Sequence, residues 1–159
     1  METKLIKSAH AVGESNYHLQ LTPAYRRDIF SDPLVKELTL GYIAQKLGQL
    51  KVVLLGYGFG PDHLHTFLGN VRHVSEIELV RQLKGYSSYM MRRGHFPLFS
   101  DKLWGKKFWS SGHFYRSVGE VTRDSMQWYV TEGQKKHWKH VTYEEFSLSK
   151  HQKILTDFS

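Results

Sequence analysis

Two histidines separated by one residue form the pattern in this chain that most strongly suggests chemistry. His63 and His65 flank Leu64 at the start of a segment, 63–68, that alternates like a half-buried β-strand. Side chains two positions apart in a strand point to the same face, roughly 6.6 Å apart along the chain. Two imidazoles placed in this way can ligate one divalent metal ion. In a chain with ten histidines, the spacing also fits an accidental pair, so both interpretations stay open.

A helix predicted near the end of the chain carries further groups that could act with this pair. Thr122 is its expected N-cap, and Tyr129, Glu132 and Gln134 follow within it. A tyrosine hydroxyl can act as a nucleophile. A single tyrosine on an amphipathic helix is more often a half-buried core residue, so the pattern alone does not assign a role to Tyr129.

The charge balance favours an anionic partner. The chain has 159 residues, a formal net charge of +7 and a pI near 9.5, which suits nucleic acid. Aromatic and basic residues are interleaved in segments 25–27, 84–86 and 104–109. Bases of a single strand can stack on such rings while the cations hold phosphates. Ordinary core packing of the rings is the alternative.

Composition also excludes several classes of protein. The chain has no cysteine, which excludes disulfides, thiolate metal sites and cysteine nucleophiles. No apolar run approaches the ~20 residues needed to span a bilayer, and residues 1–10 lack the apolar core of a signal peptide. We therefore expect a cytoplasmic protein with one domain over residues 1–159, comprising a core of about 16–138 and an accessory tail, 139–159.

Four segments are predicted to be strands, at 16–22, 51–57, 63–68 and about 113–118. The glycine-rich stretch 56–61 between the second and third strands is expected to form a bend. It lacks the Gly-Lys-Ser/Thr ending of a phosphate-binding loop and precedes a strand, which excludes that function.

Helix signals separate these strands. Asp32 is an expected N-cap followed by Pro33 at the first helical position, and Gly48 is placed to end that helix. Ser75 and Glu78 have the capping-box spacing that starts a second helix. The order is β-α-β-β-α-β followed by a helix, which predicts an α+β, ferredoxin-like fold: an antiparallel sheet with helices on one face. RNA-recognition modules share this topology.

Short stretches in a fixed order resemble the single-tyrosine transposases of small insertion sequences (the insertion-sequence 200/605 class, transposase A-like), members of the HUH (His-hydrophobic-His) endonucleases. These stretches are Tyr17-His18-Leu19, Tyr25-Arg26-Arg27, Pro61-Asp62-His63-Leu64-His65, Leu83-Lys84-Gly85 with Ser87, Leu103-Trp104-Gly105, Phe108-Trp109, Ser117-Val118-Gly119 with Thr122, and Tyr129-Val130. They span roughly residues 16 to 138.

The resemblance implies an enzyme that cuts and rejoins single-stranded DNA at transposon ends flanked by hairpins. The Tyr129 oxygen would attack phosphorus, giving a 5′-phosphotyrosine and a free 3′-hydroxyl. His63 and His65 would hold Mg or Mn, which polarises the scissile phosphate. The covalent bond keeps the energy of the broken phosphodiester, so rejoining would need no ATP.

The resemblance also implies a homodimer in a bacterial or archaeal cell, associated with the nucleoid. Each active site would be composite, with the histidine pair from one subunit and the tyrosine helix from the other. The candidate DNA contacts are Arg26, Arg27, Lys84, Arg92, Arg93, Lys106 and Lys107.

One position departs from the family pattern. The family usually has a metal-binding glutamine four residues after the tyrosine, where this chain has Gly133. At about 100° per residue, Gln134 lies about 140° around the helix from Tyr129, and Glu132 about 60°. Either a π-bulge at Gly133 returns Gln134 to the site, or Glu132 replaces it. We favour Gln134 as the third ligand.

Two other functions fit parts of the pattern. A non-catalytic ferredoxin-like module that binds single-stranded DNA or RNA would explain the charge, the aromatic residues and the fold. It would leave the histidine pair and Tyr129 coincidental. A replication-initiation nuclease of the HUH class would keep the chemistry, but such enzymes usually occur in longer chains with a helicase.

Overall fold

The computed structural model describes residues 6–7, 12–13, 15–137 and 147–148. The strands are β1 (Ile6–Lys7), β2 (Val12–Gly13), β3 (Asn16–Leu21), β4 (Val53–Gly60), β5 (His63–Gly69), β6 (Phe114–Val118) and β7 (Ser147–Leu148). The helices are α1 (Pro33–Gln49), α2 (Glu76–His95) and α3 (Arg123–His137), with short 3₁₀ turns η1 (Ala24–Arg26), η2 (Ile29–Ser31) and η3 (Phe96–Leu98).

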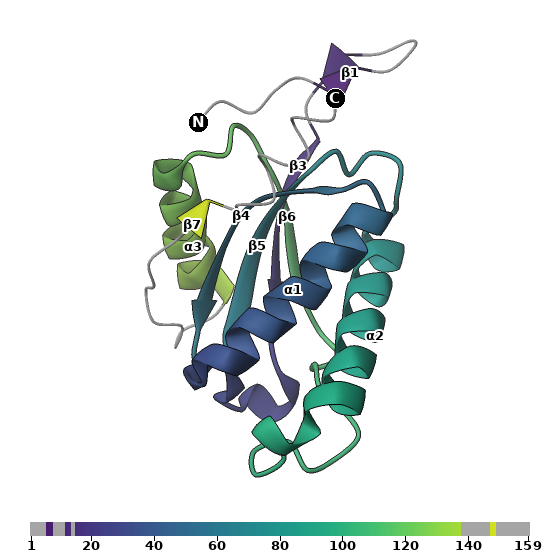
Figure 1. Cartoon of the computed structure of the whole chain (residues 1–159). Coiled ribbons are helices and arrows are strands. Elements are labelled where there is room, and N and C mark those ends of the chain that lie inside the picture. The colour runs from purple at the N-terminus through teal and green to yellow at the C-terminus, as the bar shows by residue number, and fades with distance from the viewer. Residues whose placement is uncertain (1–5, 8–11, 14, 138–146, 149–159) are drawn as a thin grey trace.

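The main sheet is antiparallel with the order β6-β3-β5-β4-β7, and β1 and β2 form a separate two-stranded ribbon. Helices α1 and α2 cover one face of the sheet and α3 lies on the other (Figure 1). The predicted α+β, ferredoxin-like arrangement is confirmed. The short strand β7 comes from the segment expected to be an accessory tail, most of which, 138–146 and 149–159, lies outside the described residues. None of the helices in the described part is long and apolar enough to cross a membrane.

The helix starts follow the sequence signals. The Asp32 side chain accepts a hydrogen bond from the Leu34 amide at 2.9 Å, and Ser75 caps α2 by accepting from Glu78 at 3.2 Å. The expected end of α1 at Gly48 is wrong by one residue, because the helix continues to Gln49.

The alternation of β5 divides its side chains between two apolar clusters. Leu64 and Leu68 pack into the larger core against α1 and α2. Phe67 belongs to a smaller cluster with Met126 and Val130 of α3. Because residues two apart share a face, His63 and His65 lie on the same face as Phe67, the α3 face.

The glycine-rich stretch is not the expected bend. Strand β4 runs through it to Gly60, and Gly56, Gly58 and Gly60 pair with Phe67, His65 and His63 of β5. Only two residues, 61 and 62, form the turn between the strands. A Cβ atom at Gly60 would lie 1.9 Å from Cε1 of His63, so the bare backbone of this position makes room for the imidazole.

Candidate functional site

The structure brings the two predicted metal ligands together at the start of β5. The rings of His63 and His65 have centroids 4.8 Å apart and an interplanar angle of 80°. Both side chains are fully buried. The strand geometry expected from the sequence therefore places two imidazoles side by side.

Asp62 orients the first of these imidazoles. Its Oδ1 atom lies 2.9 Å from Nδ1 of His63, and its Oδ2 atom accepts a hydrogen bond from Nε of Arg26 at 3.2 Å. Burial alone would raise the pKa of Asp62, but the His63 hydrogen bond and the Arg26 charge outweigh it and hold that pKa below its usual value. The ionised carboxylate can only accept, so His63 carries its proton on Nδ1 and Nε2 is the nitrogen that would ligate a metal. Carboxylates commonly hold metal-binding histidines in this way.

His18 of β3 holds the second imidazole. Its Nε2 atom lies 2.8 Å from Nδ1 of His65, and its ring stacks on Phe67 with centroids 4.7 Å apart. Burial, and then the charge of Arg116, lower the pKa of His18 to about 3. Burial, with the His18 and His63 charges, holds the pKa of His65 well below its ordinary value. Both rings are therefore neutral near pH 7, the form that binds metal.

The surroundings of the pair fit a polar ligand. Two buried nitrogens on β3, Nδ1 of His18 and Nε2 of Gln20, have no hydrogen-bond partner among the described residues. Gln20 pairs with His65 across the sheet. No group of three or more His, Asp or Glu side chains in the described part of the chain could hold a metal by itself. A metal on His63 and His65 thus needs further ligands.

Tyr129 lies on α3, half-buried against the smaller apolar cluster. Its hydroxyl oxygen accepts a hydrogen bond from the Gly119 amide at 3.4 Å, and the Arg116 guanidinium lies 5.4 Å from its ring centroid. Its hydroxyl therefore faces the chain just after β6.

That position is far from the histidine pair along the sheet. Val118, the residue before Gly119, pairs with Asn16 of β3, whereas His65 pairs with Gln20. Gly119 lies one residue beyond Val118, so its level and that of His65 differ by about five residues, roughly 16 Å at ~3.3 Å per residue. Within one chain, the structure does not bring Tyr129 to His63 and His65.

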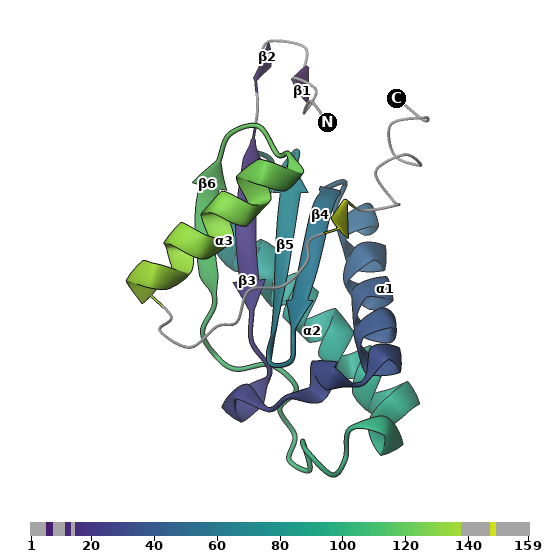
Figure 2. The same cartoon turned by 90° about the vertical axis from the view of Figure 1, so that its left-hand side faces the viewer.

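Glu132 and Gln134 lie in the last turns of α3. The helix is α-helical to His137, and the expected bulge at Gly133 is not present. Helix α3 crosses the sheet, and its C-terminal end passes beyond the β6 edge (Figure 2). The side chains of residues 132–137 lie outside those described, so the choice of third ligand stays a prediction.

One of the predicted DNA contacts lies beside the histidine pair, and three others lie at the Trp104 ring or on its loop. Arg26 bonds to Asp62, next to His63. Arg27 lies over the ring of Trp104, with its Cζ atom 5.1 Å from the ring centroid. Lys106 and Lys107 are exposed on the same loop as Trp104.

The other predicted contacts take part in interactions within the chain. Lys84 donates hydrogen bonds to the carbonyl oxygens of Ser110 and Gly112 at 2.8 and 2.9 Å, and burial lowers its pKa. Arg92 donates to the Lys107 carbonyl oxygen, and Arg93 contacts the hydroxyl of Tyr89. Lys84 and Arg92 therefore tie the loop after α2 to that helix.

The sequence pattern gave no role to Asp62, His18 or Gln20. Asp62 adjoins the histidine motif, and His18 and Gln20 are polar residues on one face of a predicted strand. Their position beside the motif and on one face of the strand could have identified these three residues as neighbours of the histidine pair.

Comparisons with known proteins show the family and the fold of this chain. The family described as "Transposase IS200 like" matches residues 11–133. The fold is similar to the 1.90 Å crystal structure of a provisionally assigned transposase from Deinococcus radiodurans R1, with a TM-score of 0.63 and 26% identity over 80% of this chain and 96% of that chain. A REP-associated tyrosine transposase bound to a REP hairpin matches with a TM-score of 0.48 and 13% identity, over 81% of this chain and 76% of that one. A comparison with curated proteins found no match. The chain belongs to the IS200-like transposase family.

Proposed function

We propose that this protein is a metal-dependent transposase that cleaves and rejoins single-stranded DNA at hairpin-flanked ends, with Tyr129 as its nucleophile. The observation that carries the proposal is the buried pair His63 and His65, held side by side through their Nδ1 atoms in a chain of this family. The whole chain would act as one domain on DNA at the nucleoid, in the cytoplasm.

The proposed cleavage step takes place at the hydroxyl of Tyr129. The phenol of Tyr129 loses its proton, and its oxygen forms a bond to phosphorus while the bond from phosphorus to the 3′-oxygen breaks. The 3′-oxygen takes a proton and leaves as a hydroxyl, and the downstream DNA stays on the protein as a 5′-phosphotyrosine. Attack by a 3′-hydroxyl reverses the step, so no external energy source is needed.

His63 and His65 would present their Nε2 atoms to Mg or Mn. When bound, the ion would polarise the scissile phosphate and stabilise the charge that develops there. We propose Gln134 as the third ligand, because the family usually has a glutamine close to this position. Glu132 is the alternative, because a regular helix places it nearer to the Tyr129 side of α3. Both side chains offer an oxygen donor, which suits these cations.

The active site would be composite, formed by two subunits of a homodimer. Support comes from the position of Tyr129, whose hydroxyl meets Gly119 and lies far from the histidine pair of its own chain. Docking of α3 on the partner's sheet would supply the nucleophile without rebuilding either sheet.

The test uses single-stranded DNA from the hairpin-bearing ends of the element that encodes the protein, labelled at either end, with Mg or Mn. We expect a covalent adduct on a denaturing gel with the 3′ label only, and none from Tyr129→Phe, which should still bind the DNA.

Three outcomes would contradict parts of this proposal. An adduct from the Phe variant would show another nucleophile, and an adduct with the 5′ label would reverse the polarity. Tight binding with no cleavage in either metal would favour the single-strand binding module. If the wild type cuts only at a replication origin, the replication-initiation nuclease would be favoured.

A further inference from the structure

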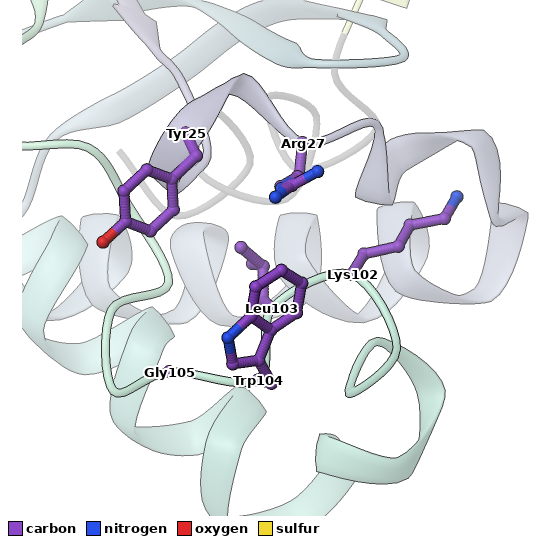
Figure 3. Close-up of a pocket in the computed structure, with 6 residues that line it drawn as sticks. All are labelled: Tyr25, Arg27, Lys102, Leu103, Trp104 and Gly105. Atoms are coloured by element: carbon purple, nitrogen blue, oxygen red, sulfur yellow. The ribbon is translucent and has the colours of Figure 1, made fainter.

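A small pocket lies between the segment after β3 and the loop after α2. Its volume is about 170 Å³, and its lining residues are Tyr25, Arg27, Lys102, Leu103, Trp104 and Gly105. At ~30 Å³ per water, this is the space of about six water molecules, which is room for one flat base. Figure 3 shows the side chains of Tyr25, Arg27 and Trp104 arranged around the same space.

Two large aromatic rings of this pocket are left exposed. Tyr25 is 80% exposed and Trp104 is 69% exposed. Rings of this size usually bury much of their surface in the core. The Arg27 guanidinium lies 5.1 Å from the Trp104 ring centroid, in cation–π range. Exposed rings beside a fixed guanidinium are the features with which proteins bind unpaired bases.

The backbone is bent in an unfavourable way to present Tyr25. Tyr25 and Arg26 are consecutive non-glycine residues with left-handed φ angles of 57° and 50°, a conformation found mostly at ligand sites and tight turns. The Ala24 amide bonds to the Phe108 carbonyl oxygen at 2.9 Å, and the Arg26 amide bonds to the Pro23 carbonyl oxygen at 3.0 Å, which holds the turn. Arg26 bonds to Asp62, while the neighbouring Tyr25 lines the pocket.

This turn connects the pocket to the candidate metal site. Arg26 contacts Asp62 at 3.2 Å, and Asp62 contacts His63 at 2.9 Å. The cations near the pocket are suited to phosphates: Arg27 and Lys102 line it, and Lys106 and Lys107 follow on the same loop. Lys102 also pairs with Asp28 at 3.3 Å, so Arg27 is the main candidate for a phosphate contact.

We propose that this pocket binds one unpaired nucleotide of the DNA strand close to the scissile phosphate. The base stacks on Trp104 and Tyr25, and Arg27 holds the adjoining phosphate. This inference rests on the proposed function, because it takes single-stranded DNA as the ligand. It adds a position at which the protein itself holds the substrate strand by stacking.

The test measures binding in a Tyr129→Phe background, in which the strand stays intact. The probes are single-stranded DNA molecules of the hairpin-bearing end, each with one abasic site at a successive position, and the readout is Kd by fluorescence polarisation. We expect one position within a few nucleotides of the cleavage point to weaken binding about ten-fold, in the range found for base–aromatic stacking.

The same series in Trp104→Ala and Tyr25→Ala should weaken binding to intact DNA and lose the effect of that abasic position. Trp104→Phe keeps an aromatic ring at this position and should retain part of the effect of that abasic position. Tyr89→Ala removes another exposed tyrosine, one that does not line the pocket, and should leave the abasic profile unchanged. Because Trp104 and Tyr25 are exposed, their replacement opens no core cavity, and circular dichroism checks the fold.

An abasic profile that is the same with and without Trp104 and Tyr25 would overturn the inference. A preference for duplex over single-stranded DNA at the pocket would do the same. Failure of the proposed function would be seen separately, as the absence of a covalent adduct from the chain with Tyr129 intact.

Discussion

The imidazole of His18 lies between Phe67, on which it stacks, and Nδ1 of His65, which its Nε2 atom meets at 2.8 Å. In this arrangement His18 would position the proposed metal ligand His65 without itself touching the metal. A bond at Nδ1 fixes the ring angle of His65 and keeps Nε2 free of its proton.

We expect His18→Phe to weaken Mn binding by about ten-fold, the lower end of the range for residues that orient metal ligands. The phenyl ring keeps the stacking on Phe67 but cannot accept the His65 hydrogen bond. His18→Asn, which offers an acceptor oxygen, should lose less. Isothermal titration with Mn measures both, and thermal melting shows whether the fold is retained.

The same titration series includes the proposed ligands. His63→Ala, His65→Ala and Gln134→Ala should each lose more affinity than His18→Phe, with Glu132→Ala near wild type. A large loss in Glu132→Ala with none in Gln134→Ala would assign the carboxylate as third ligand. If His18→Phe titrates like wild type, the contact with His65 has no part in metal binding.

The sequence predicted the shared face of His63 and His65 because that depends only on spacing within one strand. It did not predict the contact of His18 with His65, since the two residues are 47 positions apart and meet only through the register of β3 against β5. The role of Asp62 in orienting His63 was not predicted for another reason. It depends on Arg26, which the turn after β3 places next to Asp62.

The loop after α2 is held by a buried hydrogen bond. Ser87 of α2 is fully buried, accepts a hydrogen bond from Nε1 of Trp109 at 2.8 Å and donates to the Leu83 carbonyl oxygen at 2.6 Å. The loop that carries Trp104 is therefore tied to α2 at one end by a side-chain pair within the core.

We expect Ser87→Ala to lower the free energy of unfolding by about 1–3 kcal/mol, because it leaves the buried indole N–H without a partner. Replacing both residues, as Ser87→Ala with Trp109→Phe, should cost less than the sum of the two single changes, which denaturant unfolding measures. Strict additivity of the two changes would show that the bond contributes nothing to stability.

Helix starts were predicted well because caps are local: Asp32 and Ser75 each bond within three residues of their own position. The stretch from Gly56 to Gly60 was predicted as a bend because glycine is common in turns. It is a strand because Phe67, His65 and His63 of the neighbouring strand stand opposite these glycines, a long-range reason that local pattern cannot reveal.

For the whole molecule, the separation of Tyr129 from the histidine pair predicts that the protein acts as a homodimer, in which each active site combines groups from two subunits. In a heterodimer of a His63→Ala/His65→Ala subunit and a Tyr129→Phe subunit, composite sites would leave one complete site and one doubly damaged site. We expect neither homodimer to cut and the heterodimer, isolated with two affinity tags, to recover about half of wild-type cleavage. If each site were built within one subunit, a folded heterodimer would be inactive.

Gly60 also bears on how the proposed activity would be lost when copies of the gene mutate. The place of a Cβ atom at Gly60 is occupied by the buried ring of His63, which Asp62 holds by a hydrogen bond. Any amino-acid change at that codon would push the ring aside, so, under the proposed function, a copy of the gene could keep both histidines and the tyrosine and still encode an inactive protein. If the proposal holds, judging whether a related element can still move requires reading this glycine codon as well as the codons of the histidine pair and Tyr129.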